Sequence, residues 1–319
     1  MRAALRAVAG AAAILLALPL ATNSAAAADD PVTVTISEVD LNGPAIVPVT
    51  VTVTNGGTTK LSRLSVIFSG PVGWSVYPES RIVRDAVRPG QSVQVSFEIR
   101  VPERRPGFTL RTFTATASYT GGSATGTRVQ RSGEPLPDLA SAYNNVGVTD
   151  ESNPTPGNFD GDGNSFSAQK LADVGITPGR SVTALGAIFT WPSAAAGTKN
   201  NVIAGGQAIA LSGQGSKIAF LGSAAGLAAA GTATVWYTDG TSSSGTFGFP
   251  NWSFQDATAH GATLVASSDG RNRPDGYGNA GIAYRIFAHS IPVEPAKTVD
   301  LVVLPSNGSI HIFDLKLVP

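Results

Sequence analysis

The stretch Val93-Gln-Val-Ser-Phe-Glu-Ile-Arg-Val101 alternates strictly between apolar and polar residues. Because successive side chains of a β-strand point to opposite faces, this period of two predicts a strand with one buried and one solvated face. The same alternation recurs in three further runs, Val32–Ile36, Val47–Val53 and Phe113–Tyr119. With the Gly and Pro turn residues between them, about seven strands over roughly 100 residues predict an immunoglobulin-like sandwich over residues 31–132.

The second part of the chain, residues 137–319, continues the β pattern in a Gly-rich sequence. The preceding stretch Gly133-Glu-Pro-Leu-Pro137 is Pro-rich and lacks hydrophobic periodicity, which predicts a domain boundary. We expect about eight to ten strands here, with Ala168–Asp173 as a single helical turn, and therefore a jelly-roll-type sandwich. The apolar run Val182–Trp191 is expected as one strand covered on both faces. The predicted fold class is all-β, an immunoglobulin-like sandwich followed by a larger jelly-roll-type sandwich.

The N-terminal segment Met1–Ala28 has the three parts of an export signal. Arg2 and Arg6 make a basic start, an apolar stretch follows, and Ala26-Ala27-Ala28 supplies small residues for cleavage. The apolar stretch is shorter than the roughly 20 residues that span a bilayer. The pattern therefore predicts a cleaved signal peptide and a secreted, extracellular protein with no membrane association after cleavage.

Charge and composition exclude several classes of partner. Lys and Arg number 22, as do Asp and Glu, so there is no electrostatic case for binding nucleic acid or an anionic membrane. The sequence has no cysteine, so stability has to come from buried area rather than disulfides. Hydrophobic residues make up 42% of the chain and include 13 Phe, enough for substantial cores.

The first domain resembles a known module. The stretch Gly73-Trp-Ser-Val-Tyr-Pro78, the turn Pro89-Gly90 and the pair Val101-Pro102 are similar to the NEW3 domain, which occurs beside α-galactosidases and other glycoside hydrolases. The resemblance covers roughly residues 31–125 and implies an accessory role near a secreted glycosidase. Trp74 could offer a sugar-stacking face, but a large aromatic residue at a strand start more often fills the core.

The second domain also carries a resemblance. The stretches Tyr143–Asp150, Pro156–Gly163 and Val235–Gly240 are similar to β domains at the ends of secreted actinobacterial glycoside hydrolases. The resemblance implies an accessory, sugar-binding role and carries no catalytic residues.

One candidate metal site lies in the second domain. Asp160, Asp162 and Asn164 place oxygen-bearing side chains at alternate positions with glycines between them, as hard cations such as Ca²⁺ require. The same residues are also typical of Asp-Gly turns without a metal. The sequence requires no other cofactor, so structural calcium is the one cofactor that the sequence suggests.

The candidate carbohydrate site is the run Asp269–Asn279, interpreted as one loop with turns at Asp269-Gly270 and Asp275-Gly276. Sugar sites combine an aromatic plane with polar groups for the hydroxyls. The residues that could supply both are Trp252, Arg271, Arg273, Asp275, Tyr277 and Tyr284. The alternative interpretation is a solvated surface loop.

No catalytic motif is present. The three histidines show no metal-ligand spacing, and there is no Gly-x-Ser-x-Gly elbow, thiol nucleophile or phosphate-binding loop. We therefore expect a secreted, non-catalytic accessory protein that binds polysaccharide or another glycan and acts beside a secreted glycosidase. Two alternatives remain at this point: a structural or cell-surface adhesion module with a protein partner, and an unrecognised glycoside hydrolase with two facing carboxylates.

Overall fold

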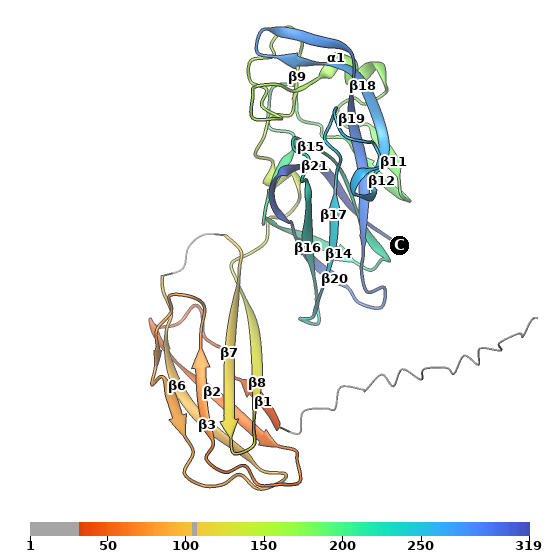
Figure 1. Ribbon diagram of the computed structural model, residues 1–319. Helices are drawn as coiled ribbons and strands as arrows, with labels where there is room; N and C mark the ends of the chain where they lie inside the picture. Colours follow the sequence, from red (N-terminus) through yellow and green to blue (C-terminus); the bar gives the residue numbers. More distant parts are fainter. Residues whose placement is uncertain (1–31, 104–106) are drawn as a thin grey trace, which may run out of the picture. The chain divides into compact units, whose positions relative to one another are not determined.

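The computed structural model describes residues 32–103 and 107–319. The predicted signal peptide, Met1–Ala28, lies outside the described residues. Contacts divide the chain into two compact units (Figure 1). Unit 1 contains the residues up to Pro102 together with Thr112–Val129, and unit 2 contains Glu103–Arg111 together with Gln130–Pro319.

Unit 1 is a sandwich of two four-stranded sheets. The first has the order β1-β2-β6-β4, with bounds Val32–Ile36, Ile46–Asn55, Ser92–Arg100 and Val76–Tyr77. The second has the order β5-β3-β7-β8, with bounds Ser80–Ile82, Ser65–Ser69, Thr109–Tyr119 and Gly122–Ser132. Strands β2 and β6 pair antiparallel and set Val49 opposite Phe97, both at most 1% exposed. The alternation in the sequence therefore produces the buried face that it predicts.

Trp74 packs against this core, with its ring 5.9 Å from that of Phe113 in an edge-on contact. The interpretation of Trp74 as a core residue is confirmed. The predicted turn after β2 is held by Asn55, which is fully buried. Its side-chain amide donates to the carbonyls of Thr59 and Val87, and its Oδ1 accepts from the Gly57 amide.

Unit 2 is built on a five-stranded sheet and a four-stranded sheet. The five-stranded sheet has the order β13-β21-β15-β19-β18, with bounds Val202–Gly205, Ser306–Val318, Lys217–Ala224, Gly276–Pro292 and Thr263–Arg273. The four-stranded sheet has the order β14-β20-β16-β17, with bounds Ala208–Gly213, Val299–Val303, Ala230–Tyr237 and Ser242–Gly248. One core cluster draws on all these strands except β18 and so joins the two sheets. The prediction of two successive sandwiches is confirmed.

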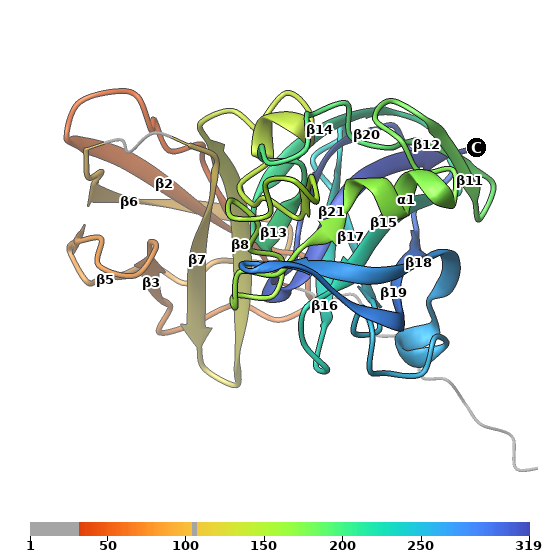
Figure 2. The ribbon, with the colours of Figure 1, turned by 90° about the horizontal axis from the view of Figure 1, so that it is seen from above.

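A second cluster covers the other face of the five-stranded sheet. It packs side chains of the sheet and Trp252 against the segment that contains β9, β10, α1, β11 and β12, with bounds Val148–Thr149, Phe166–Ser167, Ala168–Asp173, Ser181–Ala184 and Ala187–Thr190. Helix α1 has the predicted bounds; its N-cap, Ser167, accepts a bond from the Lys170 amide, and it contacts β18 (Figure 1, Figure 2). Strand β15 is consequently buried along nearly its whole length on both faces.

Two local predictions are wrong. Val182–Trp191 contains the hairpin β11–β12 instead of one strand, with Leu185 and Gly186 at positive φ in its turn, and both strands bury one face. Asp269-Gly270 is not a turn; it lies inside β18, where the register shifts between Asp269 and Arg271. The hairpin was not predicted because β11–β12 lacks a Gly-Gly or Asn-Gly turn signal. The position of Asp269-Gly270 was not predicted because a bulge can place a glycine inside a strand.

Two further 3-10 turns, η1 (Ala140–Ala142) and η2 (Ala259–Gly261), lie in the connections of unit 2. Within the described residues, no helix combines the length and apolar character needed to cross a membrane.

Candidate functional site

The predicted carbohydrate loop is a β-hairpin formed by the end of β18 and the start of β19. Asn272 pairs with Tyr277 and Arg273 with Gly276, so only Pro274 and Asp275 form the turn. Ladder pairing fixes the polar residues of this hairpin on a strand framework instead of a mobile loop. Four of the predicted site residues, Arg271, Arg273, Asp275 and Tyr277, are brought together here.

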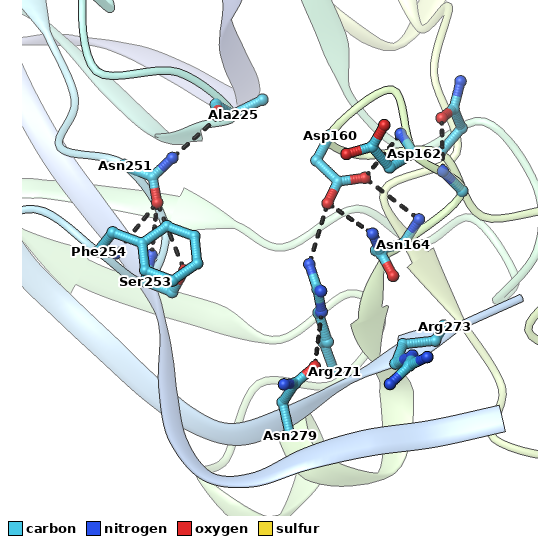
Figure 3. A network of polar contacts seen from close by, with 12 residues as sticks. Asp160, Asp162, Asn164, Ala225, Asn251, Ser253, Phe254, Arg271, Arg273 and Asn279 are labelled. Carbon is cyan, nitrogen blue, oxygen red and sulfur yellow. Dashed lines mark hydrogen bonds and ion pairs between the residues drawn. The ribbon is translucent and has the colours of Figure 1, made fainter. Parts of the chain in front are cut away.

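The side chain of Arg271 is held by partners within unit 2. Its Nη1 donates to Asp160 Oδ2 at 3.1 Å and its Nε donates to Asn279 Oδ1 at 3.0 Å (Figure 3). Its guanidinium also lies 5.9 Å from the Trp252 ring centre and 5.8 Å from that of Tyr284. The side chain is 21% exposed, so Arg271 joins the hairpin to the neighbouring loop and has little surface left for a ligand.

The assignment of Trp252 and Tyr284 as sugar-stacking residues is wrong. Each is 1% exposed, and their rings meet edge-on at 4.6 Å inside the second cluster. A ring with both faces packed against protein has no face to offer a sugar. Burial of these large aromatic side chains stabilises the fold instead.

Tyr277 is half-buried on the hairpin. Its hydroxyl donates to Asp269 Oδ2 at 2.7 Å, while the Gly281 amide donates to Asp269 Oδ1 at 2.6 Å. Partial burial and the bond to Asp269 raise the pKa of Tyr277 to about 12. The Lys170 ammonium lies 5.4 Å from the ring centre. A Cβ on Gly270 would collide with the Tyr277 ring, so only glycine lets the ring lie across β18.

The tip of the hairpin is the part open to solvent. Arg273 and Asp275 form an ion pair of 3.1 Å, and their side chains are 46% and 71% exposed. Such an exposed pair contributes little to stability, so both groups can exchange their mutual contact for hydrogen bonds to a ligand.

The candidate calcium loop is closed by protein donors. Asp160 Oδ1 accepts from the amides of Asp162 and Asn164, and Oδ2 accepts from the Asn164 side chain and from Arg271 (Figure 3). A guanidinium therefore stands where a cation would bind. Among residues 32–103 and 107–319, no group of three or more His, Cys, Asp or Glu side chains is placed to hold a metal ion. Calcium binding stays an untested prediction, and the geometry favours turn chemistry.

Sequence reasoning missed Phe254, which lies two residues beyond Trp252 and is 74% exposed. Asn251 Oδ1 accepts from the amides of Ser253 and Phe254, and its Nδ2 donates to the Ala225 carbonyl at 3.0 Å (Figure 3). Arg285 holds the same loop by donating to the Gln255 carbonyl at 2.7 Å. The signal available in the sequence was the Asx-turn residue Asn251 ahead of an aromatic residue.

This arrangement makes Phe254 a preorganised aromatic surface. Its backbone is fixed by buried or half-buried polar groups while its ring faces solvent. A ligand that covers the ring therefore pays little of the ordering entropy that a mobile loop would pay.

A buried polar network lies beneath these loops. His311 is 1% exposed, its ring centre lies 4.1 Å from that of Phe159, and its Nδ1 lies 2.9 Å from Asn201 Oδ1. The Asn201 side-chain amide already donates to Asn145 and Asn200, so Oδ1 is the acceptor and Nδ1 of His311 carries the proton. Burial lowers the pKa of His311 to about 3, so the imidazole is neutral. The network joins the segments at Asn145 and Asn200–Asn201 to His311 of β21.

The fold and these loops define a class: a two-domain β-sandwich protein whose candidate binding groups lie on a hairpin and a rigid loop of unit 2. The chain belongs to the AziU2-like β-sandwich domain family, whose model matches residues 136–318. Residues 45–120 match the NPCBM-associated NEW3 domain of α-galactosidase, which confirms the resemblance seen in the sequence.

Solved structures add similarity at low identity. A FixG-related protein from Vibrio parahaemolyticus is 13% identical, with 32% of this chain and 94% of that chain covered and a TM-score of 0.23. The secreted serine protease VesC from Vibrio cholerae is 12% identical, with coverage of 83% and 48% and a TM-score of 0.24. The GAE domain of GGA2p from Saccharomyces cerevisiae is 16% identical, with coverage of 32% and 88% and a TM-score of 0.19. No curated protein matches the chain.

Proposed function

We propose that this chain is a secreted accessory protein that binds polysaccharide through unit 2, without catalysing its cleavage. The observation that carries the proposal is Phe254, a 74% exposed aromatic ring on a loop fixed by Asn251 and Arg285. The apolar face of a sugar ring can stack on such a surface while polar groups bind its hydroxyls.

Three further observations support the proposal. The NEW3 match relates unit 1 to a module named for α-galactosidase, which fits an accessory protein of carbohydrate-active enzymes. The segment Met1–Ala28 has the pattern of an export signal, which fits a protein that meets polysaccharide outside the cell. The exposed hairpin residues Arg273 and Asp275 offer donors and acceptors of the kind that sugar hydroxyls require.

The test is a pull-down of the mature chain on insoluble polysaccharides, covering galactans, mannans, glucans and chitin. We expect retention on at least one of them, and we expect Phe254→Ala to weaken it by about tenfold, or ~1.4 kcal/mol. Ile188→Ala is the matched control, because Ile188 is also on the surface of unit 2, at 65% exposed.

The outcomes separate the candidate functions. Binding that survives Phe254→Ala unchanged contradicts the role of that ring. No retention on any polysaccharide contradicts the proposal and favours the adhesion module with a protein partner. Release of reducing sugar by the purified chain favours a glycoside hydrolase.

A further inference from the structure

A concave site lies on unit 2, outside the hairpin and outside the loop 251–255. It is a cavity of about 400 Å³ lined by residues of the η1 region, the segment after β12, and β21. Its lining includes Asp138, Tyr143, Thr190, Trp191, Ser193 and Asp314. This volume falls in the range of small-molecule sites, roughly 300–1,000 Å³.

The aromatic part of the lining is rigid. The Tyr143 hydroxyl donates to the Phe313 carbonyl at 2.8 Å, which fixes the ring against β21. Trp191 is 3% exposed and packs on the Phe313 ring at 4.4 Å between centres. Neither side chain has to be ordered when a ligand enters.

Two carboxylates contribute to the same cavity. Asp314 is 13% exposed and is held by the Thr190 amide at 2.7 Å and by the Lys316 ammonium at 3.2 Å, which balances its charge. Asp138 accepts from both the amide and the hydroxyl of Ser141 through one oxygen, Oδ1, at 2.7 Å. Oδ2 of Asp138 is thus left to accept a bond from a ligand.

The two carboxylates place negative charge at the cavity. The bonds from Ser141 lower the pKa of Asp138, which therefore stays ionised at neutral pH. Burial, followed by the charges of Asp314 and Asp138, raises the pKa of Tyr143, so both carboxylates act at the phenol ring. With Lys316 balancing Asp314, one net negative charge remains beside the half-buried ring of Tyr143.

We propose that this cavity binds a small organic ammonium ion, specifically an amino sugar in its protonated form. An ammonium group is attracted both to an aromatic face and to a carboxylate that can accept its N–H bonds. The hydroxyls of Thr190 and Ser193 can bind ring hydroxyls. The choice of a sugar body rests on the proposed function, whereas the recognition of positive charge rests on Asp138 and Tyr143.

The probes are glucosamine and glucose, which differ in one ammonium or hydroxyl group on the same ring. Each is titrated into the mature full-length chain by calorimetry or by ligand-observed NMR at neutral pH and low ionic strength. We expect saturable glucosamine binding at least about tenfold tighter than glucose binding, a difference of ~1.4 kcal/mol. N-acetylglucosamine, which lacks the positive charge, should behave as glucose does.

The matched variants are Asp138→Asn and Asp162→Asn. The side-chain oxygen of asparagine can accept the same two bonds from Ser141, so Asp138→Asn keeps these bonds and removes only the charge. It should reduce glucosamine affinity to that of glucose, whereas Asp162→Asn, a carboxylate outside the cavity, should leave it unchanged. Equal binding of glucosamine and glucose, an unaffected Asp138→Asn variant, or no saturable glucosamine binding overturns the proposal.

The Phe254→Ala variant separates this inference from the proposed function. Glucosamine binding retained by Phe254→Ala supports an independent site in the cavity, and its loss overturns that location. Polysaccharide retention without glucosamine binding would refute the cavity proposal and leave the proposed function standing.

Discussion

Acidification should destabilise unit 2 through His311. This imidazole is buried beside Phe159, donates to Asn201 and has a pKa of about 3 because burial penalises its charged form. In the unfolded chain its pKa returns to about 6.5. The stabilising effect of a neutral histidine is therefore complete above about pH 6.5 and is lost as the pH falls towards 3, because the unfolded state binds the proton first.

The magnitude follows from the separation of these two pKa values. At pH 5 the solution is about 1.5 pH units below the pKa of the unfolded histidine, which is therefore protonated. The folded histidine is still neutral at this pH. Since each unit corresponds to about 1.4 kcal/mol, the free energy of unfolding should fall by about 2 kcal/mol between pH 7.5 and pH 5 on account of His311. The fall should continue down to about pH 3.

The assay is urea unfolding followed by tryptophan fluorescence at several pH values, for the mature chain and for His311→Gln. Three of the four tryptophans, Trp191, Trp236 and Trp252, lie in unit 2, so its transition is visible. Glutamine can donate to Asn201 as the imidazole does, but it does not titrate. His260 and His289 are present in both proteins, so their contributions cancel in the difference.

We expect His311→Gln to cost stability at pH 7.5 and to lose about 2 kcal/mol less than the natural chain on going to pH 5, with unchanged m-values. If the two proteins lose stability in parallel over this range, His311 is not a buried neutral base and the network described here is wrong.

Three further outcomes test the loops and the packing of unit 2. Asp160→Ala should lower the free energy of unfolding by about 2 kcal/mol, because it leaves the half-buried Arg271 without its carboxylate partner. Asp162→Ala should change the free energy of unfolding by less than about 0.5 kcal/mol. Urea unfolding midpoints measure both effects. Calcium chloride and EDTA should leave the melting temperature unchanged, because Arg271 occupies the Asp160 carboxylate; a rise with calcium that EDTA reverses would establish a metal site instead. Gly222→Ala should lower the free energy of unfolding by about 1–3 kcal/mol, because the added Cβ would collide with an aromatic ring and a backbone carbonyl. Gly308→Ala should be nearly neutral, because the added Cβ would meet only one atom, at 3.9 Å. Equal thermal shifts in the two variants would disprove this account of β15.

Some elements follow directly from local pattern. Strand β2 contains the predicted run Val47–Val53, and helix α1 begins and ends at Ala168 and Asp173, as the sequence predicts. In β2 the alternation of side chains records a single buried face, which needs no knowledge of the partner. The candidate site was less predictable. The residues of the hairpin were found from composition. The structure shows that Arg271 of this hairpin is bound by Asp160, more than 100 residues away in sequence.

The sequence by itself determined that this chain forms two β-sandwiches, with the NEW3 resemblance in the first, because alternation and turn chemistry are local properties. Only the tertiary structure decided which aromatic residues are accessible. Trp252 and Phe254 share a five-residue loop, yet one is 1% and the other 74% exposed. The physical reason is that burial depends on non-local partners: Arg271 and Tyr284 cover Trp252, whereas Ala225 and Arg285 hold the backbone that turns Phe254 outward.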